Sequence, residues 1–238
     1  MQFSKVIILA VLCFGFHTTY SQTKTTSETY TYKSGDYSGI GKWYMGREIA
    51  YIMGYQGIGW LERPEREAEE NTTKLINNLD IKPSDVIADI GAGSGYHVFK
   101  MAPLAKNGSV YAVDIQKEML MAIELENKTK KLSNIKLIEG AEQTSNLPEN
   151  TIDKILMVDV YHEFNFPVEM LDSMKKALKK DGKIYLIEYR GEDDNVPMKR
   201  LHKMTEKQAV KEFEASGFKL LKNISNLPWQ HCMVFIKQ

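Results

Sequence analysis

The stretch from Val86 to Tyr96 constrains the fold of this chain more than any other part of it. It reads VIADIGAGSGY, so an apolar, β-rich run leads directly into a turn with glycines at Gly91, Gly93 and Gly95. Glycines let the backbone turn tightly and let a ligand approach without meeting a Cβ atom. A helix that begins behind such a turn offers free N–H groups to the ligand. The pattern predicts a buried strand, a ligand-binding turn and a helix, as in a doubly wound α/β sheet.

The rest of the chain continues this alternation of strand and helix. Short β-rich apolar runs lie at 86–90, 109–113, 135–138, 155–158 and 184–187, and segments of helical periodicity lie at 64–79, 116–127, 167–180 and 205–217. Such alternation predicts a parallel sheet with helices on both faces. No helix fits between the last two runs, 218–224 and 233–236, so they should pair as a hairpin. The predicted fold class is α/β: a doubly wound, mostly parallel seven-stranded sheet with a C-terminal antiparallel hairpin strand.

The first residues indicate export. Lys5 precedes an apolar run from Val6 to Phe16, which is too short for a bilayer that needs roughly 20 apolar residues. A positive start, a short apolar run and the small residues Thr19 and Ser21 are typical of a cleaved signal peptide. We expect residues 1–21 to be removed, which leaves no membrane span and places the protein in the periplasm or outside the cell. A buried N-terminal helix and a lipoprotein anchor are the alternatives.

Three further regions follow. Residues 22–38 are polar and predict a flexible leader. Residues 39–80 combine large rings and glycines with a helix, and predict either a cap packed on the core or a substrate lid. The charged run 62–70 is expected on the solvated face of that helix. Residues 81–238 form the predicted ligand-binding domain.

Charge and cysteine content exclude several functions. The 238 residues carry 31 Lys and Arg against 31 Asp and Glu, whereas nucleic-acid binders usually have a basic excess. We therefore expect no nucleic-acid partner. Signal cleavage would leave Cys232 alone, so an exported monomer has no internal disulfide.

A carboxylate at the end of the second strand indicates the ligand. Asp114 lies 19 residues after Gly95, where an acid can accept hydrogen bonds from both hydroxyls of a ribose. The glycines fall at relative positions one, three and five, not at the one, three and six of the dinucleotide fingerprint. Asp89 stands directly before them. An acid there disfavours a pyrophosphate and suits a cationic ligand, so an NAD-dependent oxidoreductase is the less favoured alternative.

The pattern from Asp89 to Gly95 resembles the first motif of the class I S-adenosylmethionine-dependent methyltransferases. The resemblance extends over about residues 60–238. It includes the stretch that ends at Asp114, Leu147-Pro148, Asp159 after the fourth strand and the terminal hairpin.

The resemblance implies a Rossmann-like methyltransferase fold that binds S-adenosylmethionine. The implied cofactor-binding residues are Asp89, Gly91, Ala92, Gly93, Gly95, Asp114, Ile115, Glu142 and Asp159. Within this set, Asp114 would hold the ribose, Ile115 would contact the adenine, and Glu142 would accept from the adenine amino group. A solvated loop acid is the alternative role for Glu142.

Candidate acceptor-site residues follow the fourth strand. Tyr161, His162 and Glu163 are the predicted catalytic residues, with His162 as a general base that Glu163 holds. His202 and His231 fall in segments expected on the same rim of the sheet. Three histidines and nearby acids could instead bind zinc or iron, but no tight ligand spacing supports this, and no metal ligand is assigned.

Two functions from different classes remain. The first is methyl transfer to a small-molecule acceptor. The second is an exported, non-catalytic binding protein that uses the same fold for an adenosine-like or other small ligand. Export favours the second, because S-adenosylmethionine is made in the cytoplasm, whereas the longer and more independent sequence motif favours the first.

Overall fold

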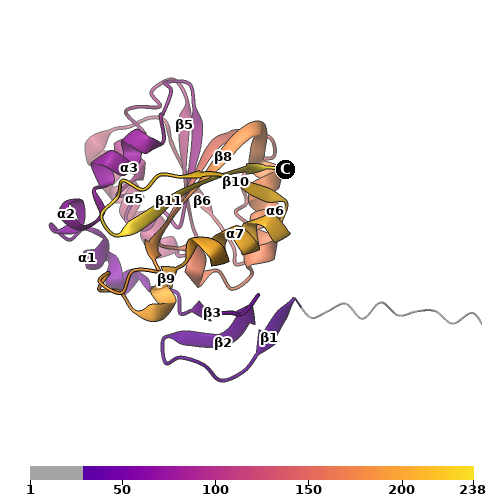
Figure 1. Ribbon diagram of the computed structural model, residues 1–238. Coiled ribbons are helices and arrows are strands. Elements are labelled where there is room, and N and C mark those ends of the chain that lie inside the picture. The colour runs from indigo at the N-terminus through magenta and orange to yellow at the C-terminus, as the bar shows by residue number, and fades with distance from the viewer. Residues whose placement is uncertain (1–28) are drawn as a thin grey trace, which may run out of the picture.

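The computed structural model describes residues 29–238 (Figure 1). The predicted signal peptide, residues 1–21, and residues 22–28 of the predicted leader lie outside the described residues. Within residues 29–238, every helix is too short or too polar to cross a membrane.

A mixed sheet forms the centre of the molecule. Its strands run in the order β10 (Phe218–Asn223), β11 (Gln230–Lys237), β8 (Leu178–Arg190), β7 (Ile152–Val158), β4 (Val86–Ile90), β5 (Ser109–Asp114) and β6 (Ile135–Glu139). The pairs from β8 to β6 are parallel, and β11 is antiparallel to both β8 and β10. This confirms the predicted fold class and the terminal hairpin. A two-residue strand, β9 (Lys203–Met204), adds an eighth member beside β8.

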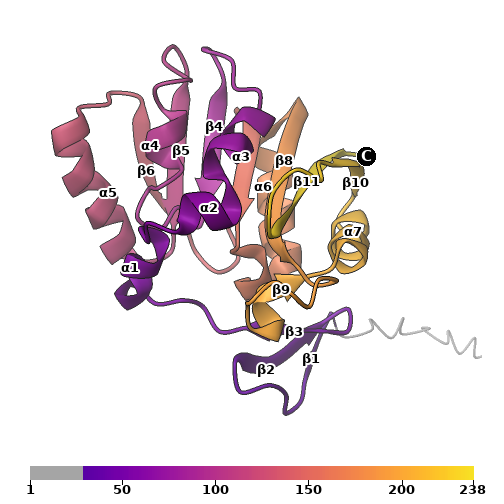
Figure 2. The same ribbon diagram turned by 60° about the vertical axis from the view of Figure 1, so that its left-hand side comes forward.

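Helices cover both faces of this sheet (Figure 2). One face packs against α3 (Thr72–Asn78), α4 (Val98–Met101) and α5 (Lys117–Lys130), and the other against α6 (Pro167–Ala177) and α7 (Glu206–Ala215). Successive strand side chains point to opposite faces, so Ile87 of β4 joins the first core and Ala88 the second. Both faces are therefore apolar, which explains why the strands read as continuous apolar runs.

Several element boundaries differ from the sequence prediction. The helix expected over 64–79 is divided into α2 (Arg66–Glu70) and α3, because Asn71 adopts a left-handed conformation with φ of 53°. The charged run 62–70 is not simply a solvated face, since Glu70 is only 1% exposed. The Glu70 carboxylate can be buried because it pairs with two arginines of the same run.

The region before the main domain forms a second, smaller sheet. Strands β1 (Tyr30–Tyr32), β2 (Gly39–Tyr44) and β3 (Arg47–Ala50) pair antiparallel in that order. This differs from the leader expected over 22–38, because β1 pairs with β2 through its backbone and the Tyr30 ring lies against Tyr44 and Phe166. Figure 2 shows the small sheet beyond one end of the large sheet, beside β9.

Two residues in the last third of the chain have clear local roles in the fold. Thr205 caps α7, because its hydroxyl accepts a hydrogen bond from the backbone N–H of Gln208 at 3.1 Å. Cys232 is fully buried in the core beneath α3, where it acts as a small apolar residue.

Candidate active site

A cavity of about 540 Å³ opens at the carboxyl ends of the parallel strands. This volume lies within the usual range for small-molecule sites, about 300–1,000 Å³. The glycine loop and Asp114 form one part of its wall, and the segment after β7 forms another. Two covering segments, around residues 52–61 and 197–202, complete it. The cavity therefore joins the predicted cofactor region and the predicted acceptor region in one space.

The glycine loop has the backbone that its sequence requires. Gly91, Gly93 and Gly95 have φ values of 73°, 54° and 86°, which side chains rarely tolerate. A Cβ atom on Gly91 would lie 2.4 Å from a methyl carbon of Val160. The loop thus forms a close-fitting cradle in which backbone, not side chains, meets the ligand.

Asp114 connects this loop to the next strand. Its Oδ2 accepts from the Gly93 N–H at 2.9 Å and its Oδ1 from the Gln116 N–H at 2.9 Å. Burial raises the pKa of this carboxyl, although the backbone donors oppose the increase. Each oxygen keeps a further acceptor position, so the carboxylate can bind the two hydroxyls of a ribose.

The other predicted cofactor residues fall into two groups. Ile115, Glu142 and Asp159 line the cavity with Gly91, Gly93 and Asp114. Asp89, near the end of β4, and the loop residues Ala92 and Gly95 do not line it.

Two of these acids carry buried oxygens without a partner. They are Oδ2 of Asp89 and Oδ1 of Asp159, among the residues that the structure describes. Burial raises the pKa of both carboxyls. Asp159 also has a φ of 51° and accepts from Gln230 at 2.6 Å. An unpartnered buried oxygen in a cavity wall suits a ligand donor such as an ammonium group.

A cluster of Arg63, Arg66, Glu70 and Tyr189 was not predicted and also lines the cavity. Arg63 and Arg66 bind the Glu70 carboxylate at 2.5 and 2.8 Å, and the Tyr189 hydroxyl donates to it at 2.8 Å. The spacing of these arginines from Glu70 is visible in the sequence, but spacing alone does not show that the four side chains are buried together. Arg63 also binds Glu69 at 2.8 Å, so two carboxylates balance the charge of the two arginines.

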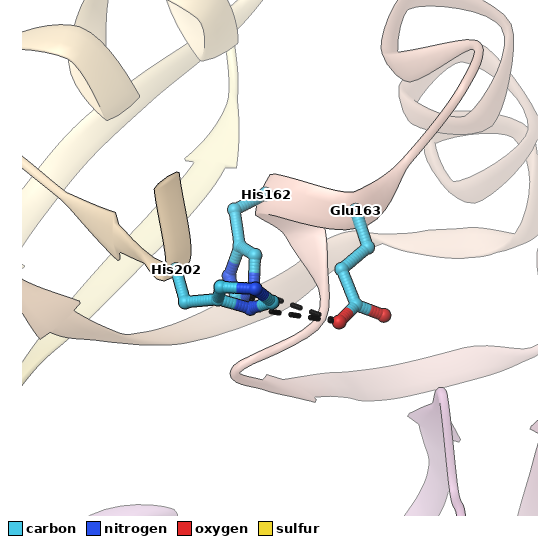
Figure 3. Close-up of side chains that lie close together, drawn as sticks. All are labelled: His162, Glu163 and His202. Atoms are coloured by element: carbon cyan, nitrogen blue, oxygen red, sulfur yellow. Dashed lines mark hydrogen bonds and ion pairs between the residues drawn. The ribbon is translucent and has the colours of Figure 1, made fainter. Parts of the chain in front are cut away.

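The histidine cluster lies in the acceptor part of the cavity, after β7. His162 belongs to a short turn, η2 (Tyr161–Glu163), and His202 to η3 (Arg200–His202). The Nε2 atom of His162 lies 3.1 Å from Nδ1 of His202. The Oε1 atom of Glu163 is 3.8 Å from each of these nitrogens. Figure 3 shows one oxygen of the Glu163 carboxylate facing the rings of both histidines.

A second carboxylate holds His162 from behind. Oε2 of Glu188 lies 2.6 Å from Nδ1 of His162, so Glu188, not Glu163, orients the ring. Burial alone would lower the pKa of His162, but the Glu188 and Glu163 carboxylates outweigh it and raise the pKa. Burial and the neighbouring His162 lower the pKa of His202 to about 4. The pair can therefore share one proton, with His162 as its main carrier.

Tyr161 and His231 do not join this cluster. The Tyr161 side chain is fully buried, and its hydroxyl donates to Glu212 at 2.9 Å. It packs into the core because the short turn directs neighbouring side chains to different sides. His231 lies on the same rim but is bound to Glu192 at 2.8 Å, outside the cavity wall.

The chain between the two sheets covers the cavity. The Met53 N–H donates to Oε2 of Glu163 at 3.1 Å, and the Met53 carbonyl accepts from Gln116 at 3.0 Å. Ile52, Trp60 and Leu61 line the cavity beside it. The part of the predicted cap from residue 52 to 61 therefore contacts the ligand space, whereas β1 to β3 pack outside it.

Comparisons with known proteins agree with this geometry. The family described as "Methyltransferase domain" matches residues 81–232. An uncharacterized methyltransferase of Bacillus subtilis (strain 168), YdaC, is 30% identical over 154 residues, which are 63% of this chain and 82% of the relative.

Solved structures share the fold. A SAM-dependent methyltransferase from Aquifex aeolicus aligns with a TM-score of 0.72 and 21% identity, over 77% of this chain and 98% of that one. The trans-methyltransferase CalH, solved in complex with SAH, aligns with a TM-score of 0.54 and 15% identity, over 66% and 52% of the two chains.

Proposed function

We propose that this chain, which belongs to the class I S-adenosylmethionine-dependent methyltransferases, methylates a small molecule held in its cavity. The observation that supports this is the single cavity in which the glycine loop and Asp114 share a wall with His162 and His202. A volume of about 540 Å³ and a partly closed cover suit a small acceptor better than a macromolecule.

The residues present fit S-adenosylmethionine, which is the cofactor of this family. Asp114 would accept from the ribose hydroxyls, and the Gly91 and Gly93 backbone would lie against the methionine portion and sugar. The unpartnered Oδ1 of Asp159 would accept from the ammonium group.

When bound, S-adenosylmethionine supplies an electrophilic methyl group on its sulfonium sulfur, and the electron pair of the broken S–CH₃ bond stays on that sulfur. The protein aligns the acceptor atom with the methyl group, which is the main contribution of such a site. The acceptor loses a proton as the new bond forms. His162 takes this proton through the pair that it forms with His202, since Glu188 holds its ring and stabilises the positive charge.

Replacement of His162 by alanine should reduce methyl transfer by about 10²-fold or more, since a positioned general base contributes about 10²–10⁴-fold. Initial rates with radiolabelled methyl donor and a panel of phenols, thiols and amines measure this. Cofactor affinity should stay within about twofold, because His162 lies in the acceptor part of the cavity.

His231→Ala is the matched control, because His231 lies on the same rim outside the cavity. Full turnover in His162→Ala would contradict the catalytic role. Cofactor binding by the unmodified protein without methyl transfer to any acceptor would favour the non-catalytic binding protein instead.

We also infer that the protein is exported. Support for this is confined to Lys5, the apolar run from Val6 to Phe16 and the small residues before Gln22. Sequencing the N-terminus of protein purified from the source cells should find Gln22 first, in a fraction outside the cytoplasm. A cytoplasmic protein that begins at Met1 would contradict export without affecting the proposed reaction.

A further inference from the structure

We propose that His162, Glu163 and His202 form a binding site for one zinc ion on the acceptor side of the cavity. The geometry of these three residues supports cation binding by itself. Only the further role of the cation, to hold the acceptor, rests on the proposed methyl transfer. In the zinc-bound protein Nε2 of His162 and Nδ1 of His202 are ligands, so the cation, not the histidine pair, would promote loss of the acceptor proton.

The three facing atoms have the separations that a shared cation requires. They are Nε2 of His162, Nδ1 of His202 and Oε1 of Glu163, with distances of 3.1, 3.8 and 3.8 Å. Atoms with these separations lie on a circle whose radius is about 2.1 Å, and zinc lies about 2.0–2.2 Å from nitrogen and oxygen ligands. A zinc ion at the centre of this circle would therefore contact all three without movement of the protein.

Groups behind two of the ligands already orient them for a cation. Glu188 binds Nδ1 of His162 at 2.6 Å, which leaves Nε2 to face the cluster. The Met53 N–H binds Oε2 of Glu163, which leaves Oε1 to face the cluster. A carboxylate behind a histidine ligand and a donor behind a carboxylate ligand are the usual supports of a metal site.

The charges of the cluster also favour a cation. Glu163 is 8% exposed and Glu188 is fully buried. Besides the Met53 N–H, the groups nearest to the Glu163 carboxylate are the two imidazoles, and buried carboxylates are costly unless they are paired. Two carboxylates balance the charge of one divalent ion, whereas a single imidazolium would balance only one of them.

The ligand set and its shape favour zinc over iron. Two histidines and one carboxylate occur in both catalytic zinc sites and ferrous sites. At about 2.1 Å from the ion, ligands are about 3.4 Å apart in a tetrahedron and about 3.0 Å apart in an octahedron. Two separations here are 3.8 Å and exceed both values, whereas the third, 3.1 Å, is near the octahedral one. Their mean, about 3.6 Å, is closer to the tetrahedral spacing, which favours zinc. All three ligands line the cavity, so the open coordination position faces the space for the acceptor.

The test uses the full chain without a polyhistidine tag, stripped with a chelator and titrated with zinc chloride by calorimetry. We expect one zinc ion per chain, and cobalt(II) in its place should give the visible absorption of a four-coordinate ion. His202→Ala and Glu163→Gln should each weaken zinc binding by about 10²-fold or more. Glu188→Gln should weaken it by about 10- to 100-fold, as loss of a supporting carboxylate does. His231→Ala should leave it unchanged.

The result that would overturn the proposal is the absence of stoichiometric zinc binding, or equal zinc binding in the unmodified protein and in His202→Ala. His202 is half-buried and Glu163→Gln preserves shape, so both variants should fold, and S-adenosylmethionine binding by each verifies this. Asp114→Ala should lose cofactor affinity and keep zinc. Failure of zinc binding with intact cofactor binding contradicts only this site, and the reverse contradicts only the proposed function.

Discussion

Replacement of Asp114 by alanine should weaken S-adenosylmethionine binding by about 10²-fold or more. Hydrogen bonds to a charged group contribute about 1.5–3 kcal/mol each, and each 1.4 kcal/mol corresponds to tenfold in affinity. The substitution removes the acceptor for two ribose hydroxyls and also the partner of the Gly93 N–H. Loss of the second contact should loosen the glycine loop and add to the effect.

Titration calorimetry with S-adenosylmethionine and S-adenosylhomocysteine measures the change. Glu139→Ala is the matched control, because Glu139 ends the neighbouring strand opposite Asp114 but is exposed and lies outside the cavity. Asp114→Asn should bind with intermediate affinity, since it keeps one acceptor oxygen and loses the charge. Equal affinity in Asp114→Ala and Glu139→Ala would show that the ribose is held elsewhere.

Replacement of Glu212 by alanine should lower the free energy of unfolding by about 3–5 kcal/mol, the cost of breaking a buried ion pair. Glu212 is fully buried and binds Arg47 through both carboxylate oxygens, at 2.9 and 3.0 Å. It also accepts from the hydroxyl of Tyr161. The substitution would leave a buried guanidinium without its counter-charge.

Urea denaturation followed by circular dichroism measures this change. Glu214→Ala, on the same helix and exposed, should change the free energy of unfolding by less than about 0.5 kcal/mol. The double variant Arg47→Met with Glu212→Gln should recover part of the loss, because it removes the unpaired charge and keeps an acceptor for Tyr161. A loss below about 1 kcal/mol in Glu212→Ala would mean that solvent reaches Arg47.

The same ion pair connects stability to the site. Arg47 belongs to the small N-terminal sheet, and its Nη1 donates to the carbonyl of His162 at 3.0 Å. Glu212→Ala should therefore also reduce methyl transfer, since it loosens the turn that carries His162. Arg47 and Glu212 are 165 residues apart in the chain, and nothing in the local sequence predicts that they meet.

The sequence predicts the cofactor region better than the acceptor region. Gly91, Gly93 and Asp114 are linked by a strand–turn–helix unit whose spacing sets their relative positions, so the motif alone placed them together. The acceptor cluster has no such local link. His162 is separated from Glu188 by 26 residues and from His202 by 40, and the prediction chose the neighbouring Glu163 as the support of His162.

The sequence by itself determined the α/β class, the terminal hairpin, the glycine cradle and the family, because each follows from short-range periodicity and from backbone conformations that only certain residues adopt. Only the tertiary structure decided that Tyr161 faces the core while His162 faces the cavity, that Glu70 is buried, and that two of three rim histidines meet. The physical reason is that burial and long-range pairing depend on how separate elements pack. The glycine motif from Asp89 to Gly95 thus specifies where the cofactor binds, and the packing of other elements around it specifies which side chains face the acceptor.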